Sequence, residues 1–221
     1  NYNGVYSRYI TALEGISDAV GENTRVYYAR GCGLFQDGDT NGYAPDLADR
    51  NWIPEAVSAA ERADVAVLCL GLSPNIEGEE MDVYNSVLSG GDRCALDLPG
   101  NQQQLLEAVC ATGKPVVVVL FTGSALAVNW ADEHCNAILN AWYPGGRGGR
   151  AVADILFGNC SPSGKLPITF YRSLDGLPAF EDYSMKGRTY RYLTQTPLYP
   201  FGYGLSYTKM ELSNLNAPAK A

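Results

Sequence analysis

Four carboxylates lie close together in one polar stretch of this 221-residue chain, at Glu77, Glu79, Glu80 and Asp82. They follow the apolar residues 65–70, whose composition predicts a buried strand. A loop carboxylic acid with a suitable environment can protonate a leaving oxygen, as the hydrolysis of a glycosidic bond requires. The same oxygens could bind a divalent cation, since hard cations take several carboxylates. A solvated acidic loop is the third interpretation, and residue types alone leave all three open.

A second pattern with possible chemistry is Gly-Arg-Gly-Gly-Arg-Ala at residues 146–151. It matches the G-x-G-x-x-A turn that binds dinucleotides, and Asp175 follows at about the distance of a ribose-binding acid. The pattern lies late in the chain instead of after a first strand. We therefore favour a tight turn before a helix that needs small residues, and we expect no cofactor. His134 is the only histidine, and without a G-x-S-x-G sequence it is expected to be a surface residue.

The elements around the acidic loop alternate between strands and helices. Apolar spacing predicts helices near residues 6–20, 54–62, 99–112, 125–131 and 150–157, and strands at 25–29, 65–70, 116–121, 137–143 and 166–170. This alternation predicts an α/β fold, a three-layer αβα sandwich with a mostly parallel sheet of flavodoxin-like topology. Ligands of such sheets bind at the carboxyl ends of the strands, where the loop of residues 71–98 begins. Residues 1–212 are expected to form one domain, and residues 213–221 a linker or tail.

Composition excludes several classes of partner. The net charge is −8 and Lys and Arg do not cluster, which argues against nucleic acid and against an anionic membrane surface. No apolar run reaches the roughly 18 residues that suggest a membrane span. The six cysteines are scattered without zinc spacing, so we expect free, buried thiols, which favour a reducing, cytoplasmic compartment. The chain begins without Met or a signal peptide, and a secreted parent protein remains open.

Tyrosine and tryptophan are frequent in the turn-rich parts of the chain, and the clustered examples are Trp142, Tyr143, Tyr190, Tyr192, Tyr199 and Tyr203. Aromatic faces suit sugar C–H surfaces and tyrosine hydroxyls suit sugar oxygens. For most of these side chains we expect the simpler role of packing the C-terminal segment against the sheet.

Short motifs follow one another in a fixed order along the chain. They are Ile76-Glu77-Gly78-Glu79-Glu80, Gly91-Asp92-Arg93, Leu98-Pro99-Gly100-Asn101-Gln102, Trp142-Tyr143-Pro144-Gly145-Gly146, Gly187-Arg188-Thr189-Tyr190-Arg191-Tyr192 and Tyr199-Pro200-Phe201-Gly202-Tyr203-Gly204-Leu205-Ser206-Tyr207-Thr208. Together they resemble the C-terminal αβα-sandwich domain of family 3 glycoside hydrolases, especially the β-xylosidase-like branch. The resemblance runs from about Asn1 to Thr208.

The resemblance implies roles for residues of the acidic loop. Related sequences place the acid/base glutamate in the pattern Gly-x-x-Pro-x-x-Glu, which here runs from Gly71 to Glu77. Glu77 is therefore the candidate acid/base and Glu79 the second candidate. Asp92 and Arg93 belong to the same family pattern and are expected to support the loop through ion pairs, with direct contact to sugar hydroxyls as the alternative. We expect no metal.

The implied function is hydrolysis of terminal β-linked sugars by a retaining mechanism that uses two carboxyl groups. Glu77 would protonate the leaving group and then activate water. The nucleophilic Asp would come from a barrel domain that precedes this domain in the family and that this chain does not contain. The implied partners are that barrel domain and an oligo- or disaccharide, and the chain alone is expected to fold without hydrolysing glycosides. Two other functions remain open, a stand-alone carbohydrate-binding or interaction module and a nucleotide-binding α/β protein.

Overall fold

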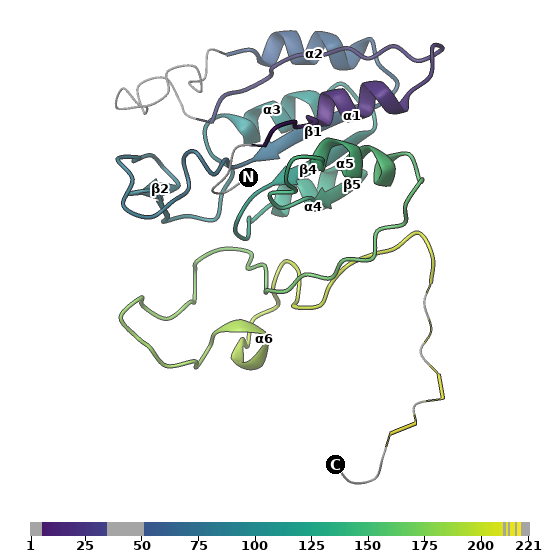
Figure 1. The fold of residues 1–221 in the computed structure, drawn as a ribbon. Helices are drawn as coiled ribbons and strands as arrows, with labels where there is room; N and C mark the ends of the chain where they lie inside the picture. The colour runs from purple at the N-terminus through teal and green to yellow at the C-terminus, as the bar shows by residue number, and fades with distance from the viewer. Residues whose placement is uncertain (1–5, 35–50, 210, 212, 215, 218–221) are drawn as a thin grey trace.

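A computed structural model describes residues 6–34, 51–209, 211, 213, 214, 216 and 217 (Figure 1). The helices are α1 (Ala12–Ala19), α2 (Ile53–Glu61), α3 (Gln102–Cys110), α4 (Asn129–His134), α5 (Gly148–Leu156) and α6 (Thr189–Tyr192). The strands are β1 (Ala66–Gly71), β2 (Leu88–Ser89), β3 (Asp92–Arg93), β4 (Val116–Phe121) and β5 (Ala137–Asn140).

A three-stranded parallel sheet in the order β1-β4-β5 forms the centre of the domain. Ala66 pairs with Val116 at one end and Gly71 with Phe121 at the other, so β1 and β4 end level with each other. The central strand β4 is Val-Val-Val-Val-Leu-Phe, and most of its side chains are buried. Such an uninterrupted apolar strand is typical of a parallel sheet covered on both faces.

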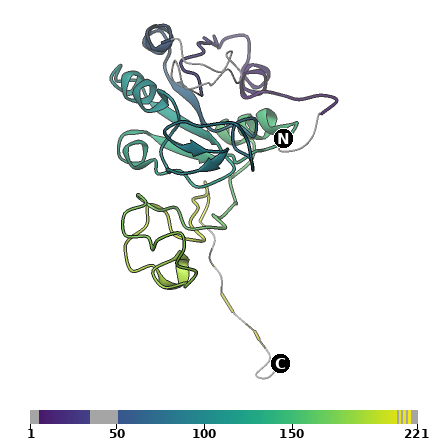
Figure 2. The ribbon, with the colours of Figure 1, turned by 90° about the vertical axis from the view of Figure 1, so that its left-hand side faces the viewer.

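Helices cover both faces of this sheet (Figures 1 and 2). The views agree that α3 and α4 lie on one face while α1 and α5 lie on the other, and α2 contacts α3. The αβα sandwich with a mostly parallel sheet is therefore confirmed. Among the described helices, none is long and apolar enough to cross a membrane.

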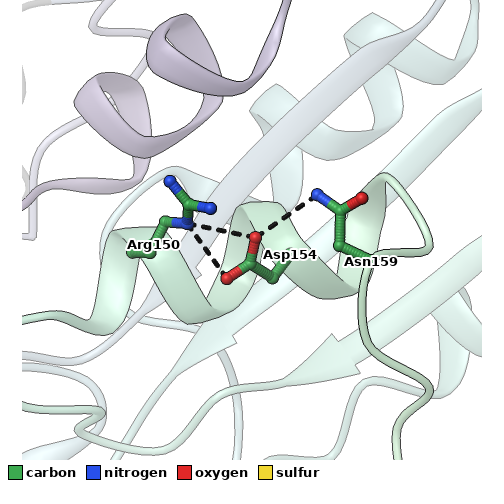
Figure 3. Close-up of polar contacts among 3 residues, drawn as sticks. All are labelled: Arg150, Asp154 and Asn159. Atoms are coloured by element: carbon green, nitrogen blue, oxygen red, sulfur yellow. Dashed lines mark hydrogen bonds and ion pairs between the residues drawn. The ribbon is translucent and has the colours of Figure 1, made fainter.

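Two glycines allow α1 and α5 to touch backbone to backbone. A Cβ on Gly15 would lie 2.2 Å from the carbonyl oxygen of Gly149, and a Cβ on Gly149 would lie 1.9 Å from the carbonyl oxygen of Thr11. Any larger side chain would push the helices apart. On the exposed side of α5, Arg150 binds the carboxylate of Asp154, which also accepts a hydrogen bond from Asn159 (Figure 3). This network joins the end of α5 to the turn that follows it.

Several predicted elements differ from the structure. The helix predicted at residues 6–20 begins only at Ala12, and the strand predicted at residues 137–143 ends at Asn140. Residues 25–29 are not a strand, and Val26 and Tyr28 are exposed. The strand at residues 166–170 was also wrong, because only Phe170 forms a bridge, with Tyr199. The helix predicted at residues 125–131 begins later, at Asn129, because the Ala127 N–H donates instead to the carbonyl of Leu96 at 2.8 Å.

Aromatic rings attach the C-terminal segment to the rest of the domain. Phe170 is 1% exposed and contacts Trp142 and Tyr199, while Tyr199 stacks on Tyr203. Beyond these rings the segment extends away from the sheet, and Tyr190 and Tyr192 are exposed (Figure 1). The packing role is therefore confirmed for Trp142 and Tyr199. The predicted tail at residues 213–221 falls partly outside the described residues, so the domain boundary stays a prediction.

Candidate functional site

Glu77 lies at the carboxyl ends of the parallel strands, and two hydroxyl groups hold its carboxylate. The hydroxyl of Ser124 donates a hydrogen bond of 2.6 Å to Oε1, and the hydroxyl of Tyr143 donates one of 2.6 Å to Oε2. Glu77 follows β1, Ser124 follows β4 and Tyr143 follows β5. Three consecutive strands of the sheet therefore contribute to one polar cluster, at the edge where open α/β sheets bind ligands.

A glycine beneath this cluster lets its members meet. A Cβ on Gly123 would lie 2.7 Å from a ring carbon of Tyr143 and 2.8 Å from Oε2 of Glu77. Contacts this short do not occur for real side chains, so a larger residue would displace one of the partners. Ser124 is oriented by Thr122, whose hydroxyl accepts from the Ser124 backbone N–H and donates to the Ser124 carbonyl. The end of β4 is thus shaped to place Ser124 and to leave space above Gly123.

The turn after β5 brings Tyr143 to Glu77. Trp142 has a φ of 53°, in the left-handed region that an aromatic residue rarely adopts. Its indole packs edge-on against buried Phe170, with ring centroids 6.0 Å apart, and that contact stabilises the unusual backbone. Burial raises the pKa of the Tyr143 hydroxyl, and the hydrogen bond to Glu77 raises it further. Tyr143 is therefore a neutral hydrogen-bond donor at ordinary pH.

Arg93 connects the cluster to the chain segment that leads into α3. Its guanidinium donates to the carbonyl of Ala95 through Nε and Nη2, at 2.9 and 2.5 Å, and to the carbonyl of Asp97 at 3.3 Å. Nη1 donates to the Ser124 hydroxyl at 3.3 Å. Burial lowers the pKa of Arg93, and the negative charge of Glu77 opposes that shift. Arg93 thus supports the loop through carbonyl oxygens, whereas Asp92 is exposed.

Apolar anchors fix the loop that carries the carboxylates. Ile76 is fully buried, and Val83, Val87 and Leu88 are each 1–2% exposed. The segment around Glu77 also pairs with the β2–β3 hairpin, because Gly78 N–H donates to the carbonyl of Gly91 at 3.1 Å. The sequence left a solvated acidic loop open as an interpretation. This loop instead has an apolar underside, so the backbone that carries its carboxylates has a defined position.

Glu79 differs from Glu77 in its surroundings, although the two are separated only by Gly78. Glu77 is half-buried and both of its oxygens accept hydrogen bonds. The Glu79 side chain is exposed and makes no hydrogen bond or ion pair with any residue in the described part of the chain. Its carboxylate oxygens are therefore open to a bound molecule, while those of Glu77 are already engaged.

The remaining acids of the loop lie around a hollow of about 440 Å³, and its lining includes Glu80, Asp82, Tyr84, Ser89 and Asp92. Within the described ranges, no three His, Cys, Asp or Glu side chains come together in a way that could hold a metal ion. The hollow has polar walls suited to hydroxyl groups of a ligand.

The G-x-G-x-x-A pattern does not form an open anion site at the start of α5. The N–H of Gly149 donates to the carbonyl of Ile10 at 3.0 Å, and the Ile10 N–H donates to the carbonyl of Gly146 at 2.7 Å. A dinucleotide phosphate needs free N–H groups and open space at a helix N-terminus. The backbone before α1 occupies that space here, so the glycines serve helix–helix contact.

Sequence reasoning missed two members of the cluster as partners of Glu77. Ser124 was not singled out, although it directly follows a strand that was predicted correctly. Tyr143 was noted only as part of a motif and as an aromatic residue. The available signal was topological, since polar residues after neighbouring parallel strands meet at one edge of the sheet. That signal needs the strand order, which the sequence did not provide.

Comparison with known proteins agrees with this architecture. The family described as "Glycosyl hydrolase family 3 C-terminal domain" matches residues 1–207. The chain is 48% identical over 165 residues to a xylan 1,4-beta-xylosidase of Xylanibacter ruminicola, covering 75% of the chain and 19% of the relative. It is 40% identical over 212 residues to a beta-xylosidase of Formosa agariphila, covering 94% of the chain and 26% of that relative.

Solved structures resemble the chain over nearly its whole length. A GH3 exo-beta-xylosidase bound to a xylobiose aziridine probe superposes with a TM-score of 0.73 at 30% identity, covering 95% of this chain and 26% of the other. A beta-glucosidase from Erythrobacter marinus gives a TM-score of 0.70 at 39% identity, covering 91% and 28%. The chain therefore belongs to glycoside hydrolase family 3 and corresponds to its C-terminal domain. It spans about a fifth to a quarter of the length of these relatives.

Proposed function

We propose that this domain supplies the general acid to the hydrolysis of terminal β-linked sugars, with xylosides as the favoured substrates. The supporting observation is the loop after β1, which is fixed through Glu77 and presents an exposed carboxylate beyond the carboxyl ends of the sheet. A retaining mechanism needs a second carboxyl group about 5–5.5 Å away, on the other side of the sugar. The family resemblance assigns that nucleophile to a barrel domain.

The contacts of the two glutamates lead us to assign them different roles. A general acid must direct an oxygen at the leaving group of the substrate. The oxygens of Glu77 are bound by Ser124 and Tyr143, whereas Glu79 is exposed and free of such contacts. We therefore propose Glu79 as the acid and later the base, and Glu77 as the residue that positions the loop. The sequence ranked them in the opposite order, and that ranking stays a prediction to be tested against this one.

The test compares Glu79→Gln with Glu77→Gln in the complete gene product that carries this chain. If Glu79 is the acid, Glu79→Gln should lose activity on xylosides with poor leaving groups and keep much of the kcat/KM for activated ones, because only the former need protonation. The kcat for activated substrates should fall, because the second step then lacks its base. Added azide should then restore turnover of the activated substrate and give a β-glycosyl azide. The melting temperature should stay near that of the wild type, since Glu79 has no described partner.

Glu77→Gln should differ from Glu79→Gln both in its dependence on the leaving group and in its melting temperature. It removes a charged acceptor from two short hydrogen bonds, so it should lower the melting temperature and slow good and poor leaving groups alike. If instead azide rescues Glu77→Gln and Glu79→Gln remains active on poor leaving groups, the acid is Glu77. If the wild-type gene product has no glycosidase activity but binds xylo-oligosaccharides, the domain is a binding module.

The described residues alone are not expected to catalyse. Glu79, Glu80 and Asp82 all belong to one loop, so they would approach a sugar from a common side. Without an opposing wall the sugar would remain solvated, and orientation and electrostatic stabilisation would be lost. Residues 1–221, purified and shown to melt cooperatively, should leave nitrophenyl β-xyloside unhydrolysed. Turnover at ordinary enzyme rates that Glu79→Gln abolishes would contradict the need for a second domain.

A further inference from the structure

Two cysteines far from the Glu77 cluster lie within contact distance of each other. The sulfurs of Cys110 and Cys135 are 3.8 Å apart, although the residues are 25 positions apart in the sequence. Cys110 is the last residue of α3, and Cys135 follows the last residue of α4. Cys69, Cys94 and Cys160 are exposed, although buried thiols were predicted.

Hydrogen bonds fix the backbone on both sides of this pair. The Cys135 N–H donates to the carbonyl of Ala131 at 2.9 Å, and the Gly113 N–H donates to the carbonyl of Cys110 at 3.0 Å. Next to Cys135, Asn136 exchanges two hydrogen bonds of 2.9 Å with the backbone of Val116 at the start of β4. The thiols are thus held close to each other by two separate elements of the folded domain, and both are partly accessible.

We propose that Cys110 and Cys135 form a site of reversible disulfide formation, with a small disulfide such as oxidised glutathione as the oxidant. A thiolate of the pair attacks a sulfur of glutathione disulfide, forms a mixed disulfide and releases one glutathione. The second cysteine loses its proton and attacks the protein sulfur of that mixed disulfide, which releases the second glutathione. The protein loses two electrons and two protons, and glutathione disulfide is reduced to two thiols.

The geometry makes this step accessible without refolding. The sulfurs are 3.8 Å apart in the folded chain, and a disulfide requires them to approach to about 2.05 Å. Burial raises the pKa of both thiols, that of Cys135 to about 12, so exchange should be slow at neutral pH. The alternative explanation is two small side chains that merely pack together. It predicts no preference for this pair over the exposed cysteines.

The cross-link would join α3 to the α4–β5 turn beside the start of β4. Glu77, Ser124 and Tyr143 gather at the opposite end of the strands, so the disulfide should leave the proposed acid loop unchanged. In the unfolded chain, the disulfide would close the segment between Cys110 and Cys135 into a loop. This should raise the melting temperature by roughly 5–10 °C, if the native geometry is not distorted. The modification is therefore a stability switch separate from the proposed catalysis.

The experiment incubates the folded chain with glutathione disulfide and, in parallel, with a reducing agent. Mass spectrometry of unreduced peptides should recover Cys110 linked to Cys135, with the loss of two hydrogens, and the melting temperature should rise. Cys69→Ser is the matched control and should behave like the wild type. Cys110→Ser and Cys135→Ser should each lose the rise and leave the remaining thiol as a glutathione adduct.

Two results would overturn the proposal. One is a peptide map in which glutathione modifies only the exposed Cys69, Cys94 and Cys160, with the pair still reduced. The other is a Cys110–Cys135 link that forms only after the chain is unfolded in denaturant, since the proposal depends on the folded geometry. A native link without any change in melting temperature would contradict the proposed stability effect.

Discussion

Tyr143→Phe removes one hydroxyl from the Glu77 cluster and leaves the ring in place. The lost bond is the 2.6 Å donation to Oε2 of Glu77, whose other oxygen keeps its bond to Ser124. A hydrogen bond to a charged group contributes about 1.5–3 kcal/mol. Both residues are half-buried, so water can partly replace the hydroxyl, and we expect a loss of about 1.5–2 kcal/mol in the free energy of unfolding. For a domain of this size the melting temperature should fall by about 3–8 °C.

The same structure provides a matched control. The hydroxyl of Tyr199 donates a 2.7 Å hydrogen bond to the carboxylate of Asp132. Burial raises the pKa of Tyr199, as it does for Tyr143, so the two hydroxyls have similar environments. The Tyr199 hydroxyl bonds to α4 and not to Glu77, and Tyr199→Phe keeps the ring that packs against Phe170. Tyr199→Phe should therefore cost similar stability and leave activity unchanged.

Activity measurements distinguish a positioning role of Tyr143 from a role in stability alone. If Glu77 fixes the loop that carries Glu79, Tyr143→Phe should lower kcat/KM by about tenfold for both good and poor leaving groups, because misplacement of a catalytic group is costly. The assay uses the complete gene product, at a temperature where wild type and both variants are folded. Equal melting losses in the two variants with full activity in Tyr143→Phe would refute a positioning role. An unchanged melting temperature in Tyr143→Phe would refute the energetic argument itself.

Three further predictions concern other parts of the domain. Gly149→Ala should destabilise the fold by about 3 kcal/mol because the new methyl would overlap the Thr11 carbonyl, and Gly164→Ala, with open space around it, should change the denaturation midpoint little. Folding raises the pKa values of Tyr143 and Tyr199, so above about pH 10 these tyrosines lose their protons in the unfolded chain before they do so in the folded one. Their contribution to the free energy of unfolding should therefore be fully present below pH 10 and fall above it. Above pH 10, replacing both tyrosines by Phe should make the free energy of unfolding fall less steeply with pH, by about 1.4 kcal/mol per pH unit for each tyrosine. Calorimetric titration with NAD should show no binding, and a micromolar affinity would contradict the role given to the glycine turn.

Periodicity was sufficient to predict the elements that are buried on both faces. The strand at residues 116–121 agrees with β4, because an uninterrupted apolar run has few other solutions in a globular domain. The strand at residues 166–170 failed because its partner, around Tyr199, pairs with it at a single bridge. Local sequence cannot reveal whether a partner strand is long enough to continue a ladder. The glycines at residues 146–151 show the same limit, since their contact is with a helix more than 130 positions earlier.

The proposal that Glu79 is the acid depends on information that the motif lacks. Glu77 and Glu79 are the same residue type in one short motif, so a pattern of letters cannot separate an oxygen bound within the protein from one left open. The separation arises because β4 and β5 end beside β1 and bring Ser124 and Tyr143 to the first glutamate. The segment then turns through Gly78, which pairs with Gly91, and the second glutamate emerges on the exposed side. The bound carboxylate of Glu77 and the open carboxylate of Glu79 have complementary roles in this proposal. A loop that must place an acid within a fraction of an ångström needs an anchor close to that acid. On this argument the two glutamates act as one unit, and a change in the anchor should reduce catalysis without changing which residue delivers the proton.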